Sequence, residues 1–275
     1  MLSAKTQPLD AMKPASLASS VLLALLASGQ AAWAGETACW YEQGVIVAPA
    51  SIDGLAGDYI LDTGAPRTLL HETKAQGAGL TETSLHGPVR IAGLSLQDQA
   101  FSVADLDART WAFPTPIAGV IGADLLAAYV VDISFEPCRV AIYPRGKAPA
   151  FETRTVLQLK RGAEVATAQA AVSDGVVSRA GDFVIATGSD TAVRIETGLA
   201  SAPGAAKPQE LLPYGAIRAK LRAASFGGEL FENLDGGLVQ DDAAATGVIG
   251  APLLARWRLR FDFPQGRLLL RPAGG

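Results

Sequence analysis

Short apolar runs separated by turn residues follow one another along most of this chain. An apolar run at 45–52 is followed by the turn signal Asp53-Gly54 and then by a second apolar run at 57–61. Runs of this length, bounded by Asp, Gly or Pro, are typical of β-strands. Two further strand pairs are predicted by the same pattern, 89–91 with 101–103 and 130–135 with 139–143. The pattern therefore predicts a mainly β protein.

Three segments interrupt the strand pattern. Residues 123–129 and 251–257 fit short helical turns. Residues 147–150 contain a proline and show no apolar periodicity, which predicts a linker near the middle of the chain.

Two segments of the first half return in the second half. Residues 57–64 (GDYILDTG) correspond to 181–188 (GDFVIATG), with four of eight positions identical and three more similar in character. Residues 119–126 (GVIGADLL) correspond to 247–254 (GVIGAPLL), with seven of eight identical. The offsets, 186 − 62 = 124 and 247 − 119 = 128, nearly agree. We therefore expect two copies of one structural unit.

Composition and charge narrow the class of protein. The chain has 275 residues, of which 49% are hydrophobic and 18% charged, enough for a sizeable core. A formal charge of −4 argues against nucleic acid and anionic membrane surfaces as partners. The two histidines, His71 and His86, and the two cysteines show no metal-ligand spacing. We therefore expect no metal and no cofactor.

The N-terminus is typical of an export signal. An apolar stretch at 17–26 is followed by Ala32-Trp33-Ala34, a small-residue cleavage site. Cleavage after Ala34 would leave 275 − 34 = 241 residues. No run reaches the roughly 20 apolar residues of a membrane span. We expect a signal peptide at 1–34, a periplasmic or secreted location and no stable membrane span after cleavage, with an uncleaved anchor as the alternative.

An exported chain meets an oxidising compartment. With two cysteines, Cys39 and Cys138, only one intramolecular disulfide can form, and we predict it. The alternative is two unpaired cysteines.

The chain resembles the acid (aspartic) peptidases in three features. These are the turn Asp62-Thr63-Gly64-Ala65 after an apolar run, the apolar-glycine element at 120–126, and the repetition of both. Within them it is most similar to exported bacterial proteins related to retropepsins and pepsins. The resemblance implies a mainly β, two-lobed acid-protease fold of β-barrel type, produced by internal duplication. Its lobes would span 35–146 and 151–272, and its substrate would be a peptide or protein.

The resemblance also implies a mechanism with two carboxylates. In this family, an Asp from each lobe shares a proton around one water, because like charges about 3 Å apart cannot both ionise. One carboxylate activates the water and the other polarises the scissile carbonyl. Here Asp62 is the catalytic candidate, and Thr63 would hydrogen-bond to the opposite lobe. The second turn is degenerate and reads Ala186, Thr187, Gly188, Ser189.

Three hypotheses for Asp62 follow. The first, which we favour, is an aspartic endopeptidase whose second carboxylate comes from Asp62 of another molecule, as in homodimeric retropepsins. The second is a catalytically impaired protein that binds extended peptides, because Ala186 replaces the second Asp. In the third, Asp62 only caps its turn.

Other acids and the substrate-covering loops are less well defined. No acid convinces as a second catalytic carboxylate among those considered, Asp58, Asp124, Asp182 and Asp190. By resemblance, the candidate flaps are 77–87 and 203–215. His86 could lie at the tip of the first, although a solvated loop histidine is the alternative we favour. Aromatic residues that could line a cleft, or belong to the core, are Trp111, Phe113 and Trp257.

Overall fold

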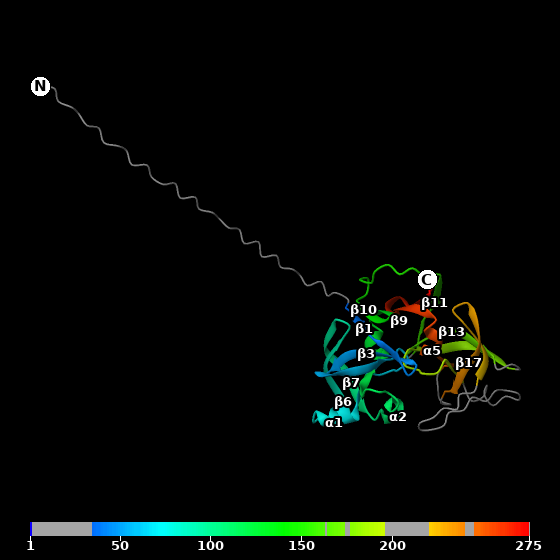
Figure 1. Cartoon of the computed structure of the whole chain (residues 1–275), viewed down its shortest axis with the longest axis horizontal. Coiled ribbons are helices and arrows are strands. Elements are labelled where there is room, and N and C mark those ends of the chain that lie inside the picture. Colours follow the sequence, from blue (N-terminus) through cyan, green and yellow to red (C-terminus); the bar gives the residue numbers. More distant parts are fainter. Residues whose placement is uncertain (2–34, 163, 174–176, 196–219, 240–244, 275) are drawn as a thin grey trace. The chain divides into compact units, whose positions relative to one another are not determined.

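The computed structural model describes Met1 and residues 35–162, 164–173, 177–195, 220–239 and 245–274 (Figure 1). Ala32–Gly275 forms one compact unit. The predicted signal peptide, apart from Met1, and the second flap candidate at 203–215 lie outside the described residues. Within the described part of the chain, no helix has the length and apolar character needed to cross a membrane.

Six strands of the first half close into the N-terminal barrel. Their order is β3-β4-β8-β5-β7-β6, and β6 pairs back onto β3, while β2 extends the sheet beside β3. The strand bounds are β2 (Trp40–Glu42), β3 (Val45–Ile52), β4 (Leu55–Leu61), β5 (Leu69–His71), β6 (Ser84–Ile91), β7 (Leu94–Ala104) and β8 (Ile117–Ile121). The hairpin predicted at 89–91 and 101–103 is therefore longer than its apolar residues suggested.

Six strands of the second half close into the C-terminal barrel in the equivalent order. This order is β13-β14-β18-β15-β17-β16, with β16 pairing back onto β13 and β12 beside β13. The strand bounds are β12 (Lys160–Arg161), β13 (Ala166–Ser173), β14 (Ser178–Ala186), β15 (Val193–Ile195), β16 (Lys220–Phe226), β17 (Glu229–Leu238) and β18 (Gly247–Gly250). The mainly β, two-lobed architecture predicted from the repeats is confirmed.

A third sheet joins the two barrels. Its order is β1-β10-β9-β19-β20-β11, and the barrels meet where β9 pairs antiparallel with β19. The strand bounds are β1 (Glu36–Ala38), β9 (Val130–Phe135), β10 (Cys138–Tyr143), β11 (Thr155–Gln158), β19 (Trp257–Asp262) and β20 (Arg267–Pro272). The residues between β10 and β11 include the predicted linker at 147–150, which has no regular structure.

The helices are short. Their bounds are α1 (Glu72–Gly77), α2 (Asp107–Thr110), α3 (Ala123–Leu126), α5 (Ala251–Leu254) and the 3₁₀ helix η1 (Phe263–Gln265). The helical turns predicted at 123–129 and 251–257 end earlier than expected. Trp257 is instead the first residue of β19, where its ring packs edge-on against Phe226 and Phe231 in the core. Burial of this large ring in the barrel favours the strand over a longer helix.

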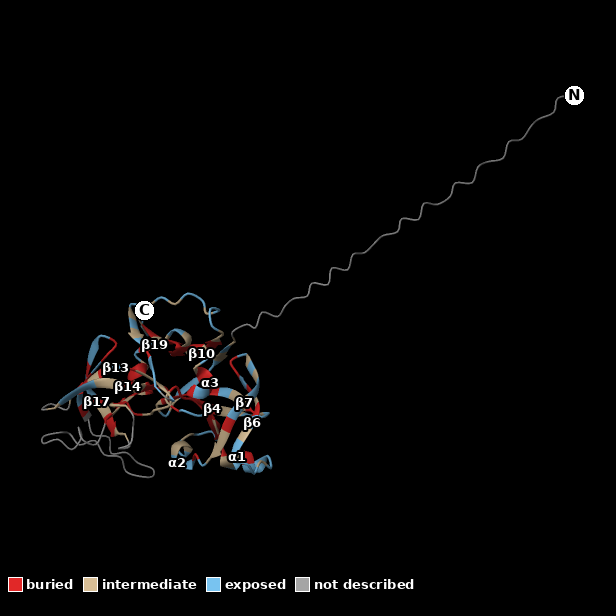
Figure 2. Cartoon of the chain, turned by 180° about the vertical axis from the view of Figure 1, so that it is seen from behind, coloured by how far each residue is buried: buried red, intermediate tan, exposed pale blue. Residues whose placement is uncertain are grey.

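Buried residues follow the strands of both barrels (Figure 2). In the N-terminal barrel, β8 lies between β4 and β5 and all five of its residues are buried. A strand that is covered on both faces needs a continuous apolar run, which explains why the sequence at 117–121 does not alternate.

An ion pair is buried where β9 meets β19. Arg260 pairs in register with Asp132, and its Nε and Nη2 donate to the two carboxylate oxygens of Asp132, each at 2.6 Å. Its Nη1 donates to the carbonyl of Pro149 at 2.6 Å, and its guanidinium lies over the Phe151 ring. Because 260 − 132 = 128, the two residues occupy equivalent positions of the repeat. The duplicated units therefore meet through opposite charges at one equivalent site.

A disulfide fastens the start of the described chain to the joining sheet. Cys39 and Cys138 are bonded, with their Cα atoms 5.0 Å apart and 99 residues apart in sequence. It connects the residue between β1 and β2 to the first residue of β10. Cross-linking a loop of this length restricts the unfolded chain, which stabilises the fold by an amount on the order of 4 kcal/mol in the chain-entropy model.

Removing one partner of the buried ion pair should destabilise the protein strongly. The Arg260→Met substitution leaves Asp132 without its cation, and we expect it to lower the free energy of unfolding by about 3–5 kcal/mol. Replacing both residues, as in Arg260→Met with Asp132→Leu, should recover most of this loss because no unpaired charge remains. Urea denaturation followed by circular dichroism measures both. Equal losses in the single and double variants would contradict this account.

Candidate active site

The two repeated turns follow equivalent strands of the two barrels. Asp62 comes directly after β4, which runs parallel to β8, and its N–H donates to the carbonyl of Ile121 at 3.0 Å. Ala186 is the last residue of β14. This strand runs parallel to β18, and Ala186 lies opposite Gly250 in the pairing. The apolar-glycine element of each unit thus lies beside the turn of the same unit, which explains why both motifs recur together.

The threonines of the two turns hold each other reciprocally. The Thr63 hydroxyl donates to the carbonyl of Ile185 at 2.5 Å, and the Thr187 hydroxyl donates to that of Leu61 at 2.7 Å. Each hydroxyl also accepts the other threonine's backbone N–H, at 3.1 and 3.2 Å. Both side chains are buried. These four hydrogen bonds join the two barrels at the turns and place Asp62 opposite Ala186 in one chain.

The glycines of the turns are required by this close approach. A Cβ on Gly64 would collide with Ala186, and a Cβ on Gly188 would collide with the side chain of Asp62. Each glycine therefore gives space to the residue of the opposite turn. Ala65 is buried beside these turns, and its carbonyl accepts the N–H of Ala123 at 2.7 Å.

The carboxylate of Asp62 is surrounded by hydrogen-bond donors. Its Oδ1 accepts the backbone N–H of Gly64 at 2.8 Å and that of Gly188 at 3.2 Å. Its Oδ2 accepts Nη2 of Arg109 at 2.5 Å. The Asp62 side chain is only 8% exposed. All three groups donate, so both carboxylate oxygens of Asp62 act as acceptors in this arrangement.

Arg109 is the functional residue that the sequence analysis missed. It lies on α2, between β7 and β8, and its Nη2 also donates to the carbonyl of Gly188 at 3.1 Å. The guanidinium therefore contacts both turns. No sequence signal indicated it, because Arg109 is separated from Asp62 by 47 residues and belongs to no motif.

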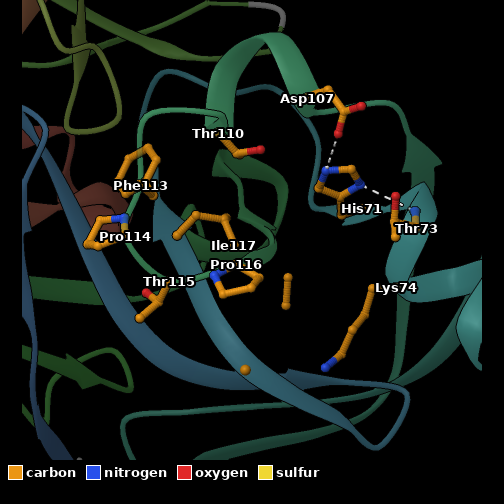
Figure 3. A pocket seen from close by; sticks show the side chains of 12 residues that line it. His71, Thr73, Lys74, Asp107, Thr110, Phe113, Pro114, Thr115, Pro116 and Ile117 are labelled. Carbon is orange, nitrogen blue, oxygen red and sulfur yellow. Dashed lines mark hydrogen bonds and ion pairs between the residues drawn. The ribbon is translucent and has the colours of Figure 1, made fainter.

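Two contacts hold α2 in place. Nε2 of His71 lies 3.2 Å from a carboxylate oxygen of Asp107, and its Nδ1 accepts the N–H of Thr73 at 3.3 Å (Figure 3). Because Nδ1 is an acceptor, Nε2 carries the proton and donates to Asp107. Leu106, just before α2, is buried in the same apolar cluster as Ala65. Arg109 thus follows closely after two anchored residues, Leu106 and Asp107.

A cavity of about 430 Å³ lies beside this anchor (Figure 3). It is lined by Gly57, by His71, Thr73 and Lys74, by Asp107 and Thr110 of α2, and by residues 113–118. The cavity therefore shares α2 with the Asp62 site.

The structure keeps the other acids considered from the sequence away from the hydrogen bonds of Asp62. Each is bonded elsewhere: Asp58 to Thr115, Asp124 to Thr68, Asp182 to Lys160 and Gln169, and Asp190 to Thr191 and Arg194. Among the described residues, Asp62 consequently has no carboxylate partner in this network.

The first flap candidate, 77–87, does not form a hairpin of its own. This segment holds the end of α1, a stretch without regular structure and the start of β6. His86 lies on β6 and contacts Asp98 of β7 at 3.2 Å. The segment that reaches Asp62 is instead the one carrying α2. The hairpin that follows α1 turns at Ala92-Gly93, too late in the chain to serve as the predicted flap.

The three aromatic residues considered for a cleft differ in placement. Trp257 is a core residue, Phe113 is partly buried against the cluster around Ala65, and Trp111 at the end of α2 is exposed.

Burial raises the pKa of Tyr59 on β4 to about 12, so this phenol stays protonated in its core position. No group of three or more His, Cys, Asp or Glu side chains suited to a metal ion occurs in the described ranges.

Comparisons with known proteins agree with the fold and with the first turn. Residues 48–125 match the family model described as aspartyl protease. The structure is similar to the aspartic proteinase from Irpex lacteus, with a TM-score of 0.54 at 13% identity over 86% of this chain and 97% of that chain. It is also similar to basic 7S globulin from soybean, with a TM-score of 0.51 at 11% identity over 86% of this chain and 94% of that one. At these identities the likeness shows the fold alone. No curated protein sequence matches the chain.

The matched model covers both motifs of the N-terminal barrel, the turn after β4 and the apolar-glycine element of β8. The chain is thus similar to the aspartyl protease family over residues 48–125, and its two-barrel fold is that of the aspartic proteinases it resembles.

Removing the Thr63 hydroxyl should loosen the junction of the barrels. The Thr63→Ala substitution leaves the carbonyl of Ile185 and the N–H of Thr187 without partners in a buried position. Each such group costs about 1–3 kcal/mol, so we expect a loss of about 2–5 kcal/mol in the free energy of unfolding. Thr73→Ala, at an exposed threonine of α1, is the matched control and should change stability by less than about 0.5 kcal/mol. Urea denaturation of both variants tests this, and similar midpoints would contradict it.

Proposed function

We propose that this chain binds extended peptides and does not hydrolyse them through Asp62. One observation carries the proposal: the lone carboxylate of Asp62 faces Ala186 and is bonded to the guanidinium of Arg109. A peptidase-type family and fold support a peptide as ligand. The fold of this family holds a peptide as an added strand through backbone hydrogen bonds, which needs no second carboxylate.

The two-carboxylate reaction needs a base for the water and an acid for the scissile carbonyl. Ala186 supplies no acid, and the four other acids considered from the sequence are bonded elsewhere. Oδ2 of Asp62 is bonded to a cation, and Oδ1 to two backbone N–H groups. An attacking water would have to share Oδ2 with the guanidinium of Arg109. The geometry therefore favours the impaired alternative over the active endopeptidase.

A second acid from another molecule would require a different pairing of barrels. Asp62 of a second copy can face Asp62 only if the hydrogen bonds between Thr63 and Thr187 are exchanged for bonds between two copies of Thr63. An N-terminal barrel paired with its own copy in this way would also place Asp132 opposite Asp132, in the position that Arg260 now fills. Like charges in a buried position are strongly unfavourable. The internal pairing is therefore the one these residues favour.

The location is proposed on separate grounds. We infer export, with a signal peptide at 1–34 and a periplasmic or secreted mature chain. The bond between Cys39 and Cys138 supports this, because disulfides persist in oxidising compartments.

Cleavage of an unfolded protein tests the proposal directly. We expect the purified mature chain to leave casein intact from pH 3 to 7, as judged by mass spectrometry of soluble fragments, and the Asp62→Ala variant to behave alike. Fragments produced by the parent chain but not by Asp62→Ala would establish an active aspartic peptidase instead.

Binding is measured on the same proteins. Equilibrium dialysis against a pool of randomised seven-residue peptides should show retention of peptide by the mature chain. A chain that neither retains peptide nor cleaves casein would contradict the proposal.

A further inference from the structure

The guanidinium of Arg109 has more donors than the described residues use. Arginine carries five N–H groups, and Nη2 makes both of the bonds to Asp62 and Gly188. Among the described residues, Nε and Nη1 of Arg109 donate to no protein acceptor. The side chain is 31% exposed, whereas that of Asp62 beneath it is 8% exposed. The accessible part of this ion pair is therefore its cation.

The degenerate second turn leaves this cation without a second carboxylate. Ala186 is neutral, and Asp190, the acid that follows the turn, is bonded to Arg194 and Thr191. Arg109 has only the carboxylate of Asp62 as an anionic partner in the described structure. A partly exposed guanidinium that is held at only one nitrogen is suited to bind a carboxylate from a ligand.

The position of Arg109 is fixed before a ligand arrives. Its segment is anchored by the bond between His71 and Asp107 and by the buried side chain of Leu106. Nη2 is held between Asp62 of one barrel and Gly188 of the other. Little side-chain freedom remains to be lost on binding, which favours affinity.

We propose that Arg109 is the recognition residue for a carboxylate of the bound peptide, and that the site selects peptides with an acidic side chain or a free C-terminus over neutral peptides. This rests on the proposed peptide-binding function and names its ligand class. Asp62 is a positioning residue in this scheme, since it orients the guanidinium. In this scheme, Asp62 has lost its catalytic partner at position 186 and is instead paired with Arg109. Both differences fit a site that binds the charged group of a peptide and does not cleave it.

The test compares three synthetic pools of acetylated seven-residue peptides whose other positions are randomised among residues other than Asp, Glu and Cys. The first pool has a central Glu and an amidated end, the second a central Gln and an amidated end, and the third a central Gln and a free C-terminal carboxylate. Equilibrium dialysis against the full mature chain measures the apparent affinity for each. We expect at least one acidic pool to bind about 10- to 100-fold more tightly than the neutral pool, the range of a charge-assisted hydrogen bond. Which acidic pool binds identifies the source of the carboxylate.

Three variants connect the preference to Arg109. The double variant Arg109→Gln with Asp62→Asn removes both charges, so it leaves no uncompensated ion, and it should bind the acidic pools no better than the neutral one. Asp62→Asn alone keeps an amide oxygen that can accept the Arg109 N–H and hold the guanidinium in place, but it removes the competing negative charge, so it should raise the preference severalfold. The matched control Arg90→Gln removes one exposed positive charge from β6 and should leave the preference as it is.

The outcomes separate this proposal from the proposed function. Equal binding of the acidic and neutral pools by the parent chain would overturn carboxylate recognition and leave peptide binding intact. A preference that disappears in Asp62→Asn, or that falls as far in Arg90→Gln as in the double variant, would also overturn it. If no pool binds, both the function and its ligand class are rejected.

Discussion

The reciprocal bonds between Thr63 and Thr187 are the constraint on which the rest of the site depends. They fix the two turns against each other, so that Gly188 approaches Asp62 and Gly64 approaches Ala186. Because this approach is symmetric, each turn has one position for an acidic residue. The chain has kept the junction at both turns and the acid at only one. The two threonines therefore join the barrels whether or not both turns carry a catalytic Asp.

The carboxylate of Asp62 accepts hydrogen bonds from both turns, including the turn in which Ala186 replaces the second Asp. Oδ1 of Asp62 accepts the N–H of Gly64 from its own turn and that of Gly188 from the opposite turn, while Arg109 occupies Oδ2. Left without these partners, a carboxylate this deeply buried would be costly. The hydrogen bonds and the cation compensate for that cost, and they use three of the roughly four lone-pair sites of the carboxylate.

The same divergence of equivalent positions appears away from the site. Asp132 and Arg260 are equivalent in the repeat and face each other across the joining sheet. Opposite charges at one equivalent position make the pairing of unlike units favourable and the pairing of like units unfavourable. Duplication supplied the symmetric framework, and unequal substitutions at equivalent positions made the two barrels complementary partners.

The sequence by itself was sufficient to predict the duplication, the strand-rich fold and the turn that carries Asp62. These features depend on local periodicity and on motifs that are contiguous in the chain. The strand boundaries, the early end of the helical turns and the absence of a flap hairpin at 77–87 depended on packing, as the burial of Trp257 in β19 illustrates. Only the tertiary structure revealed Arg109. A contact between residues 47 positions apart arises from the path of the chain between β7 and β8 and from the anchoring of α2 by His71, neither of which leaves a periodic or contiguous signal in the sequence.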